Sequence, residues 1–305
     1  MGDKILYIII FAWVKVHSWL PMPVLYVLSD ILYIIIYYVA RYRRKVVRNN
    51  MKNSFPDKTE KEIIHLERRF YHYFSDYIIE TIKLASISEE ELLRRAHIRN
   101  TNVIFDLIDK GHTCFIFSMG HYGNLDLFTG VSAHFEGRAI IHSLYRPLKN
   151  KAFDRLILYL RTRFRSFGIK KNDILREMIN LKRNKTHAVI SFAADQSPSR
   201  ANLHYWTTFL NQESSIYTGP ERIAKKLDIP VVYGDMRIQK RGFYTVDVSL
   251  ITDNPKETPE FYITDKYTEL MEKTIMRDPA YWLWTHKRWK YKRQEAIDKN
   301  TKNEE

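Results

Sequence analysis

The strongest constraint on the fold is the run Thr113–Met119, whose letters TCFIFSM are almost entirely apolar. A second run, His187–Ala193 (HAVISFA), has the same character. Short apolar runs of this kind are typical of strands buried on both faces, as found in parallel sheets covered by helices. Residues 137–141 and 229–236 are further strand candidates. The sequence therefore indicates a sheet at the centre of the molecule.

Helical patterns lie between these strands, at residues 152–164, 173–181 and 219–227. Strands that alternate with helices predict an α/β fold with a largely parallel sheet flanked by helices. Residues 230–250 resemble a hairpin that turns near 240–242, so we expect the sheet to be mixed.

Two capping signatures mark helices before the first strand. Thr59 with Glu62 has the capping-box spacing and precedes apolar residues at helical intervals, and Ser88 with Glu91 repeats it. We expect a helix to begin after each.

The first 45 residues are unlike the rest. Apolar runs at 5–14 and 24–40 precede a basic cluster at 41–45, a pattern typical of a membrane anchor with its cytoplasmic side after the second run. The first run is short for a span, and the second contains Asp30. We expect residues 1–45 to anchor the chain, by one tilted span or a shallow hairpin, and residues 46–305 to form a domain on the cytoplasmic side. A signal peptide and buried soluble helices are the alternatives.

The charge and cysteine content of the chain restrict the kinds of partner and cofactor that it can bind. Lys and Arg total 49 against 35 acidic residues, a formal charge of +14. This excess predicts a polyanionic partner such as an anionic membrane, a phosphorylated lipid, an acidic protein or nucleic acid. The single cysteine, Cys114, excludes a disulfide scaffold, and neither metal-ligand spacing nor a phosphate-binding glycine loop occurs. We expect no metal and no nucleotide cofactor.

The main candidate site follows the strand 113–119, in the segment from Gly120 to Asp126 (GHYGNLD). Active sites of open α/β sheets gather just outside the carboxyl ends of strands. If Gly120 and Gly123 bend the chain, His121 and Asp126 can meet as a general base and its orienting carboxylate. A capping aspartate beside an ordinary turn histidine is the alternative.

No nucleophile accompanies this pair. Ser118 lacks the first glycine of a Gly-x-Ser-x-Gly elbow, and Cys114 lies inside an apolar strand. A His–Asp pair would then activate a hydroxyl of the substrate. Arg146 could place a guanidinium at the same edge of the sheet, where Asp195 and Gln196 follow the second strand. Further candidates are alternating arginines and an aromatic–basic cluster that suits either a membrane interface or core packing: Arg161, Arg163, Arg165, Trp282, Trp284, His286, Arg288 and Trp289.

These motifs, in this order, resemble the lipid A biosynthesis acyltransferases, the lauroyl and myristoyl transferases that add secondary acyl chains. The likeness covers nearly the whole chain. It rests on these residues: Gly120-His121-x4-Asp126, Tyr145-Arg146-Pro147, Asp195-Gln196, Phe209, Thr218-Gly219 with Ile223-Ala224, and Trp284-x-His286-Lys287-Arg288. The chain departs from the family pattern at 208–210 and 214–216, a segment that bears on acyl length and acceptor.

The resemblance implies an enzyme of the bacterial inner membrane, with its catalytic domain on the cytoplasmic face. His121, oriented by Asp126, would deprotonate a hydroxyl of a phosphorylated glycolipid that attacks a thioester of acyl carrier protein or coenzyme A, without an acyl-enzyme. It also implies substrate-binding roles for Gly123, Asn124, Arg146, Arg165, Asp195 and Gln196. Acylation of another lipid, such as a lysophospholipid or an amino-acid-headed lipid, is the alternative. A membrane-tethered scaffold is a more distant one, and no nucleic-acid motif is present.

Overall fold

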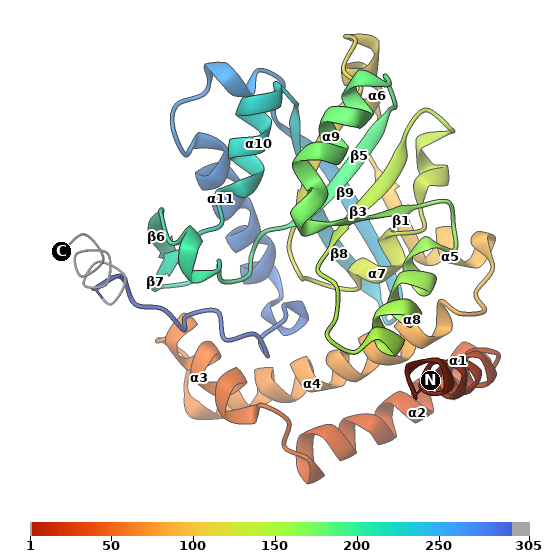
Figure 1. The fold of residues 1–305 in the computed structure, drawn as a ribbon. Coiled ribbons are helices and arrows are strands. Elements are labelled where there is room, and N and C mark those ends of the chain that lie inside the picture. Colours follow the sequence, from red (N-terminus) through yellow and green to blue (C-terminus); the bar gives the residue numbers. More distant parts are fainter. Residues whose placement is uncertain (1, 295–305) are drawn as a thin grey trace.

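In the computed structural model, which describes residues 2–294, seven strands form one sheet in the order β1–β9–β8–β2–β5–β3–β4 (Figure 1). Neighbouring strands run parallel except β8 and β9, which form an antiparallel hairpin. The predicted mixed, largely parallel sheet is confirmed. The strands are β1 (Ala96–Arg99), β2 (Cys114–Met119), β3 (Ile140–Tyr145), β4 (Phe167–Lys170), β5 (Ala188–Ala193), β8 (Val231–Lys240) and β9 (Phe243–Thr252).

Two strands begin later than the sequence predicts. In each case the first predicted residues cannot extend the strand or lack an N–H group to donate to it. Gly137 has a φ of +76°, which places it in a turn, and β3 begins only at Ile140. Pro230 has no N–H, so β8 begins one residue later, although the carbonyl of Pro230 still accepts from the N–H of Ile116. A separate two-stranded hairpin is formed by β6 (Trp206–Phe209) and β7 (Gln212–Ser215).

Both capping predictions are confirmed. The Thr59 hydroxyl accepts from the N–H of Glu62, whose carboxylate accepts from the N–H of Thr59, and Ser88 accepts from the N–H of Glu91. The α-helices are α1 (Gly2–Ser18), α2 (Met22–Ile34), α3 (Arg44–Ser54), α4 (Glu60–Lys83), α5 (Glu89–Arg95), α6 (Asn102–Asp109), α7 (Leu125–Phe128), α8 (Lys151–Thr162), α9 (Ile174–Arg183), α10 (Gly219–Leu227) and α11 (Tyr262–Arg277).

The core lies around β2, every residue of which is buried, including the free thiol of Cys114. Helices α9 and α10 pack against β2, and α11 packs against β8 and β9. Helix α4 runs below the carboxyl ends of the central strands (Figure 1). Its position there is what brings its side chains to the loop after β2.

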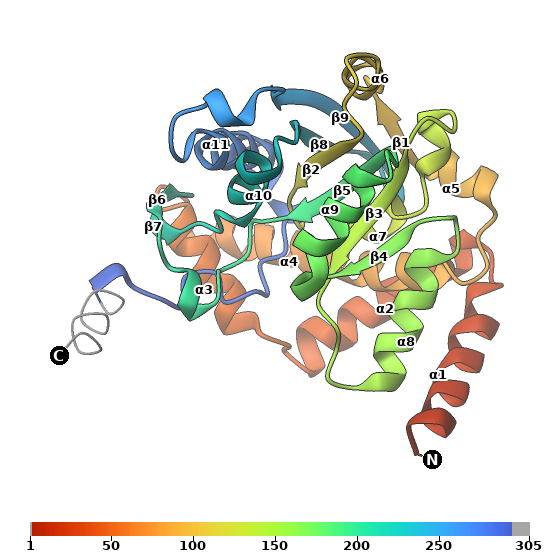
Figure 2. The ribbon, with the colours of Figure 1, turned by 45° about the horizontal axis from the view of Figure 1, so that its top comes forward.

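The N-terminal helices lie along this body. Helix α1 packs against α8 and α4, and α2 packs against α4 (Figures 1 and 2). A π-helix (Ile35–Val39) continues α2, and residues 22–39 are long and apolar enough to cross a membrane by length and composition, with 22% of that segment buried. The basic, polar end of the sequence predicts that the last dozen residues fray, and positions 295–305 lie outside the described residues.

Candidate active site

Parallel pairing of β2 with β5 brings two polar residues together. Met119 and Ala193, the last residues of the two strands, are partners in the register. His121 and Asp195 each lie two residues further on, so both emerge at the same edge of the sheet. The Nδ1 atom of His121 is 2.7 Å from Oδ1 of Asp195.

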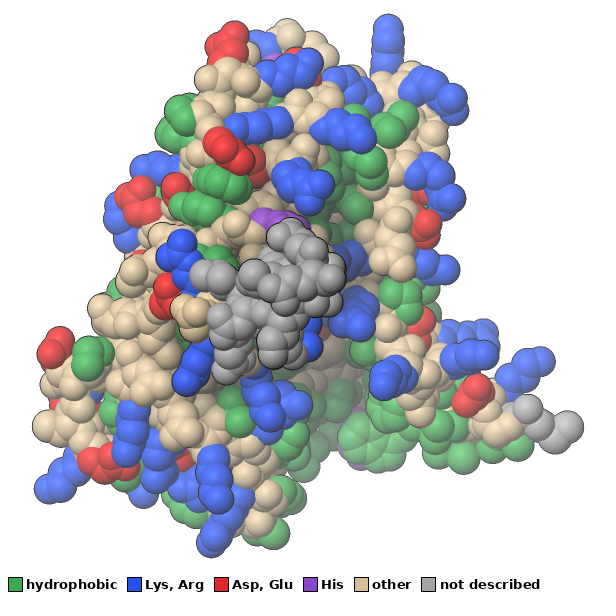
Figure 3. All heavy atoms as spheres, turned by 60° about the vertical axis from the view of Figure 1, so that its left-hand side comes forward, with side chains coloured by type: hydrophobic (Ala, Val, Ile, Leu, Met, Phe, Trp, Pro, Cys, Tyr) green, Lys and Arg blue, Asp and Glu red, His purple; other side chains and the backbone are tan. Residues whose placement is uncertain are grey.

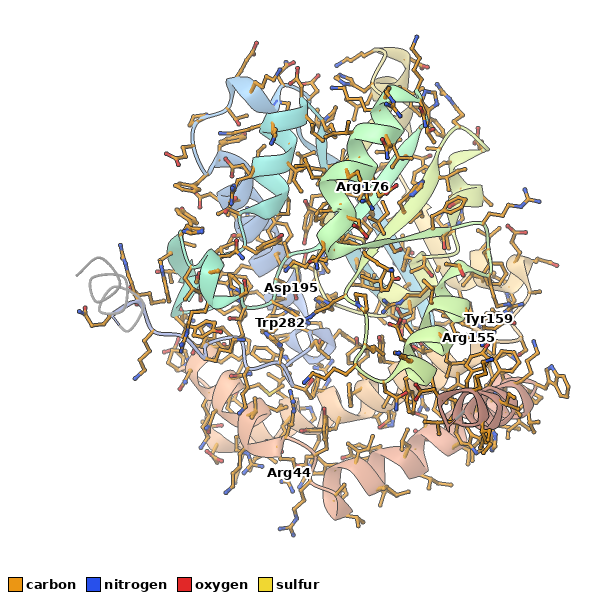
Figure 4. All side chains as sticks on the ribbon, viewed as in Figure 1. Arg44, Arg155, Tyr159, Arg176, Asp195 and Trp282 are labelled. Carbon is orange, nitrogen blue, oxygen red and sulfur yellow. The ribbon has the colours of Figure 1, made fainter. Side chains whose placement is uncertain are left out.

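The Asp195 carboxylate accepts two further hydrogen bonds. The backbone N–H of His121 donates to Oδ2 at 3.0 Å, and the indole N–H of Trp282 donates to the same oxygen at 2.7 Å. Figure 4 shows Asp195 and Trp282 side by side below the sheet. The Asp195 side chain is 1% exposed, and burial opposes its ionisation. The charge of His121 and the three hydrogen bonds outweigh that effect and lower the pKa of Asp195.

These contacts define the tautomer of the histidine. An ionised carboxylate can only accept, so Nδ1 of His121 carries the proton and Nε2 of the neutral ring has a free lone pair. The side chain is 32% exposed. Burial lowers its pKa, but the charge and hydrogen bond of Asp195 outweigh burial and leave that pKa above the ordinary value. In this arrangement Nε2 of the neutral His121 ring is able to accept a proton.

Asp126 has different partners. Its Oδ1 accepts from Nε of Arg161 at 2.8 Å, and its Oδ2 accepts from the hydroxyl of Tyr77 at 2.7 Å. Asp126 does lie in the first turn of α7, as expected, but the orienting contact to His121 comes from Asp195 instead. The physical reason is the strand register, which aligns residue 195 with residue 121, whereas α7 turns Asp126 towards α4 and α8.

The loop that carries His121 is fixed on both sides. The backbone N–H of Leu283 donates to the carbonyl of His121 at 3.0 Å, and that of Gly123 donates to the carbonyl of Tyr281 at 2.9 Å. On the other side, the hydroxyl of Tyr73 on α4 donates to the carbonyl of Gly123 at 2.8 Å. Gly123 has a φ of +60°, which favours glycine, so the predicted bend is confirmed.

The side chain of Asn124 links the start of α7 to α4. It is fully buried, its side-chain oxygen accepts from the N–H of Asp126 at the start of α7, and its amide donates to Glu80 at 2.9 Å. Glu80 also accepts from the hydroxyl of Tyr244 at 2.8 Å. Burial raises the pKa of Glu80 to about 7, although these donors oppose the rise.

Two cavities meet beside this loop. The smaller, of about 350 Å³, is lined by His121 and Gly123. The larger, of about 520 Å³, is mainly apolar and lies between α1, α4 and α8. Four residues line both cavities: Tyr77, Asp126, Ser143 and Arg161. A long apolar group in the larger cavity can therefore end close to His121.

The other predicted site residues lie further away. Arg146 is exposed and lines only the larger cavity, while exposed Arg165 and half-buried Gln196 line neither. Arg161, four residues before Arg165 and still within α8, lines both. In the aromatic cluster, Trp282 and Trp284 are buried, so the core-packing alternative holds for them.

The sequence did not indicate the contacts that three residues make at this site. Arg161 was one of three alternating arginines, and its helical position in α8 is what separates it from its neighbours. Tyr77 lay on the apolar stripe of α4, where its hydroxyl gave no signal. Trp282 lies 87 residues after Asp195, and only its membership of an aromatic cluster could have suggested a contact.

One group of possible metal ligands exists among residues 2–294. Asp30, His72 and Asp76 bring their ligand atoms within 4.8 Å of one another. The guanidinium of Arg241 already lies between the two carboxylates, 2.5 Å from Asp30 and 2.6 Å from Asp76. This cluster suits an ion-pair network better than a cation.

Comparisons with known proteins identify the family of this chain. The family model for bacterial lipid A biosynthesis acyltransferases matches residues 3–291. A lipid A biosynthesis acyltransferase of Haemophilus influenzae is 25% identical over 256 residues, which cover 83% of this chain and 79% of that protein. The residues matched by the family model include the His121 loop, the Asp195 strand end and the segment containing Trp282. The chain thus belongs to the bacterial lipid A biosynthesis acyltransferases and is an O-acyltransferase.

Proposed function

We propose that this enzyme transfers a fatty acyl group from an acyl carrier protein thioester to a hydroxyl of a lipid A precursor. The observation that carries the proposal is the His121–Asp195 pair, with His121 lining the smaller cavity, which adjoins the larger one. Family membership supports the reaction class and the type of acceptor.

In the proposed mechanism His121 acts as general base and Asp195 orients it. Nε2 takes the proton of the acceptor hydroxyl while the oxygen attacks the thioester carbonyl. The tetrahedral intermediate collapses with cleavage of the carbon–sulfur bond, and the proton on Nε2 passes to the departing thiolate. Asp195 stabilises the imidazolium between these steps and remains ionised. The products are an ester and a free thiol, and the enzyme returns to its starting state.

Arg161 is our candidate for stabilising the oxyanion. Its guanidinium lines both cavities, and Asp126 and Tyr77 hold it in place. The backbone N–H of Gly123, an obvious alternative donor, already donates to the carbonyl of Tyr281. A guanidinium positioned before the reaction can stabilise developing negative charge without reorganisation. Asp126 then supports the transition state through Arg161, and Asp195 supports it through His121.

The larger cavity suits an acyl chain. Its walls include apolar residues of α1, α4 and α8, and it adjoins the cavity of His121. The excess of positive charge suits an acidic carrier protein and the phosphates of a lipid A precursor. We place the reaction at the inner membrane, with the catalytic domain on its cytoplasmic face, where carrier-protein thioesters are available.

The test uses detergent-purified enzyme, a tetraacylated lipid A precursor and acyl carrier protein thioesters, with the acceptor followed by mass spectrometry. We expect a mass gain of one acyl chain that is absent in His121→Ala. Coenzyme A thioesters in parallel reactions identify the donor. Thioester consumption without a change in the lipid A precursor would overturn the proposed acceptor in favour of another lipid. Full activity of His121→Ala would overturn the proposed base.

A further inference from the structure

Exposed hydrophobic side chains are concentrated on the two N-terminal helices. Among the described residues, fourteen of the twenty-one large hydrophobic side chains that are exposed lie between positions 5 and 42. On α1 and just after it they are Ile5, Ile8, Ile9, Trp13, Val16 and Trp19. On α2 and the π-helix that follows they include Val24, Val27, Ile31, Ile34, Ile35 and Val39. Most are three or four residues apart, so each helix exposes one apolar face.

The opposite faces of these helices bind the protein body. On α2, the hydroxyl of Ser29 donates to Asp76 at 2.6 Å, and that of Tyr26 donates to Glu80 at 3.2 Å. On α1, Nζ of Lys15 donates to the carbonyl of Ala85 at 2.6 Å. The orientation of the exposed apolar faces is thus fixed by polar contacts on their inner sides.

Helix α2 runs antiparallel to α4 over its whole length. Before α2, the carbonyl of Leu20 accepts from Nζ of Lys83 at the end of α4. In its middle Ser29 contacts Asp76, and after the π-helix the carbonyl of Tyr42 accepts from the hydroxyl of Tyr71. Both ends of the apolar segment are thus attached to the second half of α4, between Tyr71 and Lys83.

This attachment is incompatible with a membrane span by α2. If α2 crossed the bilayer in this arrangement, residues 71–83 of α4 would follow, and Arg241, which pairs with Asp30 of α2 and Asp76 of α4, would enter the hydrocarbon with them. Moving these charged groups into the hydrocarbon would cost several kcal/mol. Detaching α2 would instead leave Asp76 and Glu80 of α4 without their partners on α2. Neither cost arises if α2 lies parallel to the membrane surface.

We propose that α1 and α2 form an in-plane platform that docks the enzyme on an anionic membrane without crossing it. Exposed cations lie at the ends of the platform: Lys4 before the apolar face of α1, and Arg41 and Lys45 after that of α2. In Figure 3 hydrophobic side chains line the lower edge of the molecule at the right, with Lys and Arg side chains above them. Apolar side chains flanked by cations match the acyl region and the headgroups of an anionic leaflet.

The platform continues into the larger cavity. Ile10 and Trp13 of α1 line that cavity, and so do three of the seven remaining exposed hydrophobic residues, Leu148, Phe153 and Phe167. Arg155 and Tyr159 of α8 contact Tyr7 and Phe11 of α1 and hold the two helices together (Figure 4). An acyl chain can therefore pass from the membrane to the cavity over apolar surface.

Cysteine labelling tests whether the platform crosses the membrane. Native Cys114 is buried in β2, so it gives little background. Single cysteines are introduced as Lys4→Cys, Pro21→Cys and, as a reference in the body, Glu89→Cys. All three positions are exposed. A membrane-impermeant maleimide is applied to inverted vesicles and to right-side-out spheroplasts. We expect Lys4→Cys and Pro21→Cys to label only from the side that labels Glu89→Cys.

Labelling of Pro21→Cys from the opposite side overturns the proposal, whether Lys4→Cys follows it, as in a single span, or stays, as in a transmembrane hairpin. Vesicle flotation tests the platform itself. Vesicles of phosphatidylethanolamine with a minority of phosphatidylglycerol should bind the purified protein, and added salt should weaken the binding. Ile8→Glu with Ile31→Glu should lower the partition coefficient about 100-fold, since two exposed isoleucines no longer bury.

The matched control is Leu250→Glu with Met276→Glu, which replaces exposed apolar residues outside the platform. We expect it to bind vesicles like the unmodified protein. Equal loss of binding in both double variants, or no loss in either, would overturn the assignment of the lipid-binding face. Circular dichroism verifies that each variant is folded. Neither the labelling nor the flotation requires enzymatic activity.

Discussion

The indole N–H of Trp282 donates to Oδ2 of Asp195 at 2.7 Å, while the other oxygen of that carboxylate contacts His121. The C-terminal segment thereby holds the carboxylate that contacts the His121 ring. We expect Trp282→Phe to lower kcat several-fold, because Asp195 loses one of three donors. It should also raise the apparent pKa of His121 slightly, since a carboxylate with fewer donors attracts the imidazolium more strongly.

Trp284→Phe is the matched control. Trp284 is also buried, but its indole N–H donates to the carbonyl of Pro279, away from the base. We expect a lower melting temperature and an unchanged pH profile of kcat/KM. If both tryptophan variants alter the pH profile alike, Trp282 has no special relation to Asp195.

The roles of the two carboxylates can be separated by pH. In the proposed mechanism unprotonated His121 is the base, so we expect activity to fall as pH drops through the pKa of His121, which is raised above its ordinary value. Asp195→Asn removes the charge that raises this pKa, so the acid limb of the kcat/KM profile should move to lower pH. The plateau should fall by about 10²- to 10⁴-fold.

Asp126→Asn should lower the plateau through Arg161 and move the acid limb much less. The measurement is the pH dependence of kcat/KM for both variants between about pH 5 and 9. A large shift in Asp126→Asn with none in Asp195→Asn would return the orienting role to Asp126.

Substitution of Arg161 tests whether its guanidinium stabilises the oxyanion. Arg161→Lys keeps the positive charge but loses the planar fork that contacts Asp126, so we expect kcat to fall about 10- to 100-fold with a smaller change in KM. Arg165→Lys makes the same substitution at an exposed residue outside both cavities and should change kcat less than about twofold. Steady-state kinetics with saturating acceptor distinguishes the two.

Glu80 should make stability depend on pH. Burial raises its pKa from 4.5 to about 7, so the folded state favours the protonated carboxyl. This contribution is complete below about pH 4.5 and is lost as pH rises to about 7, a change on the order of 3 kcal/mol. Glu80→Gln keeps a neutral side chain and should lose less stability over that interval. Thermal unfolding of both proteins at pH 5 and 8 measures the difference. Parallel pH dependences would contradict the assignment.

The sequence predicted the elements that local chemistry determines. The apolar runs of β2 and β5, the Thr59 capping box and the Gly123 bend depend on residues close together in the chain, and each is confirmed. His121 was placed at a strand end for the same reason.

Contacts between residues on different elements could not be predicted from such local patterns. The contact between His121 and Asp195 depends on β2 and β5 being neighbours in register, although β3 and β4 intervene in sequence. Arg161 reaches Asp126 because α8 packs beside the loop, and Trp282 reaches Asp195 from the far end of the chain. The motif His-x4-Asp suggested a local pair, and tertiary structure gave each member a distant partner instead.

The antiparallel pairing of α2 with α4 affects how a water-soluble version of this enzyme should be made. Deleting residues 1–45 looks attractive because it removes most of the exposed hydrophobic surface. The deletion would also remove Tyr26 and Ser29 from Glu80 and Asp76, and Glu80 holds Asn124 beside the catalytic loop. A protein trimmed in this way would lose part of the support of its active site. Replacing outward-facing residues of α1 and α2 with polar ones would improve solubility while leaving that support intact.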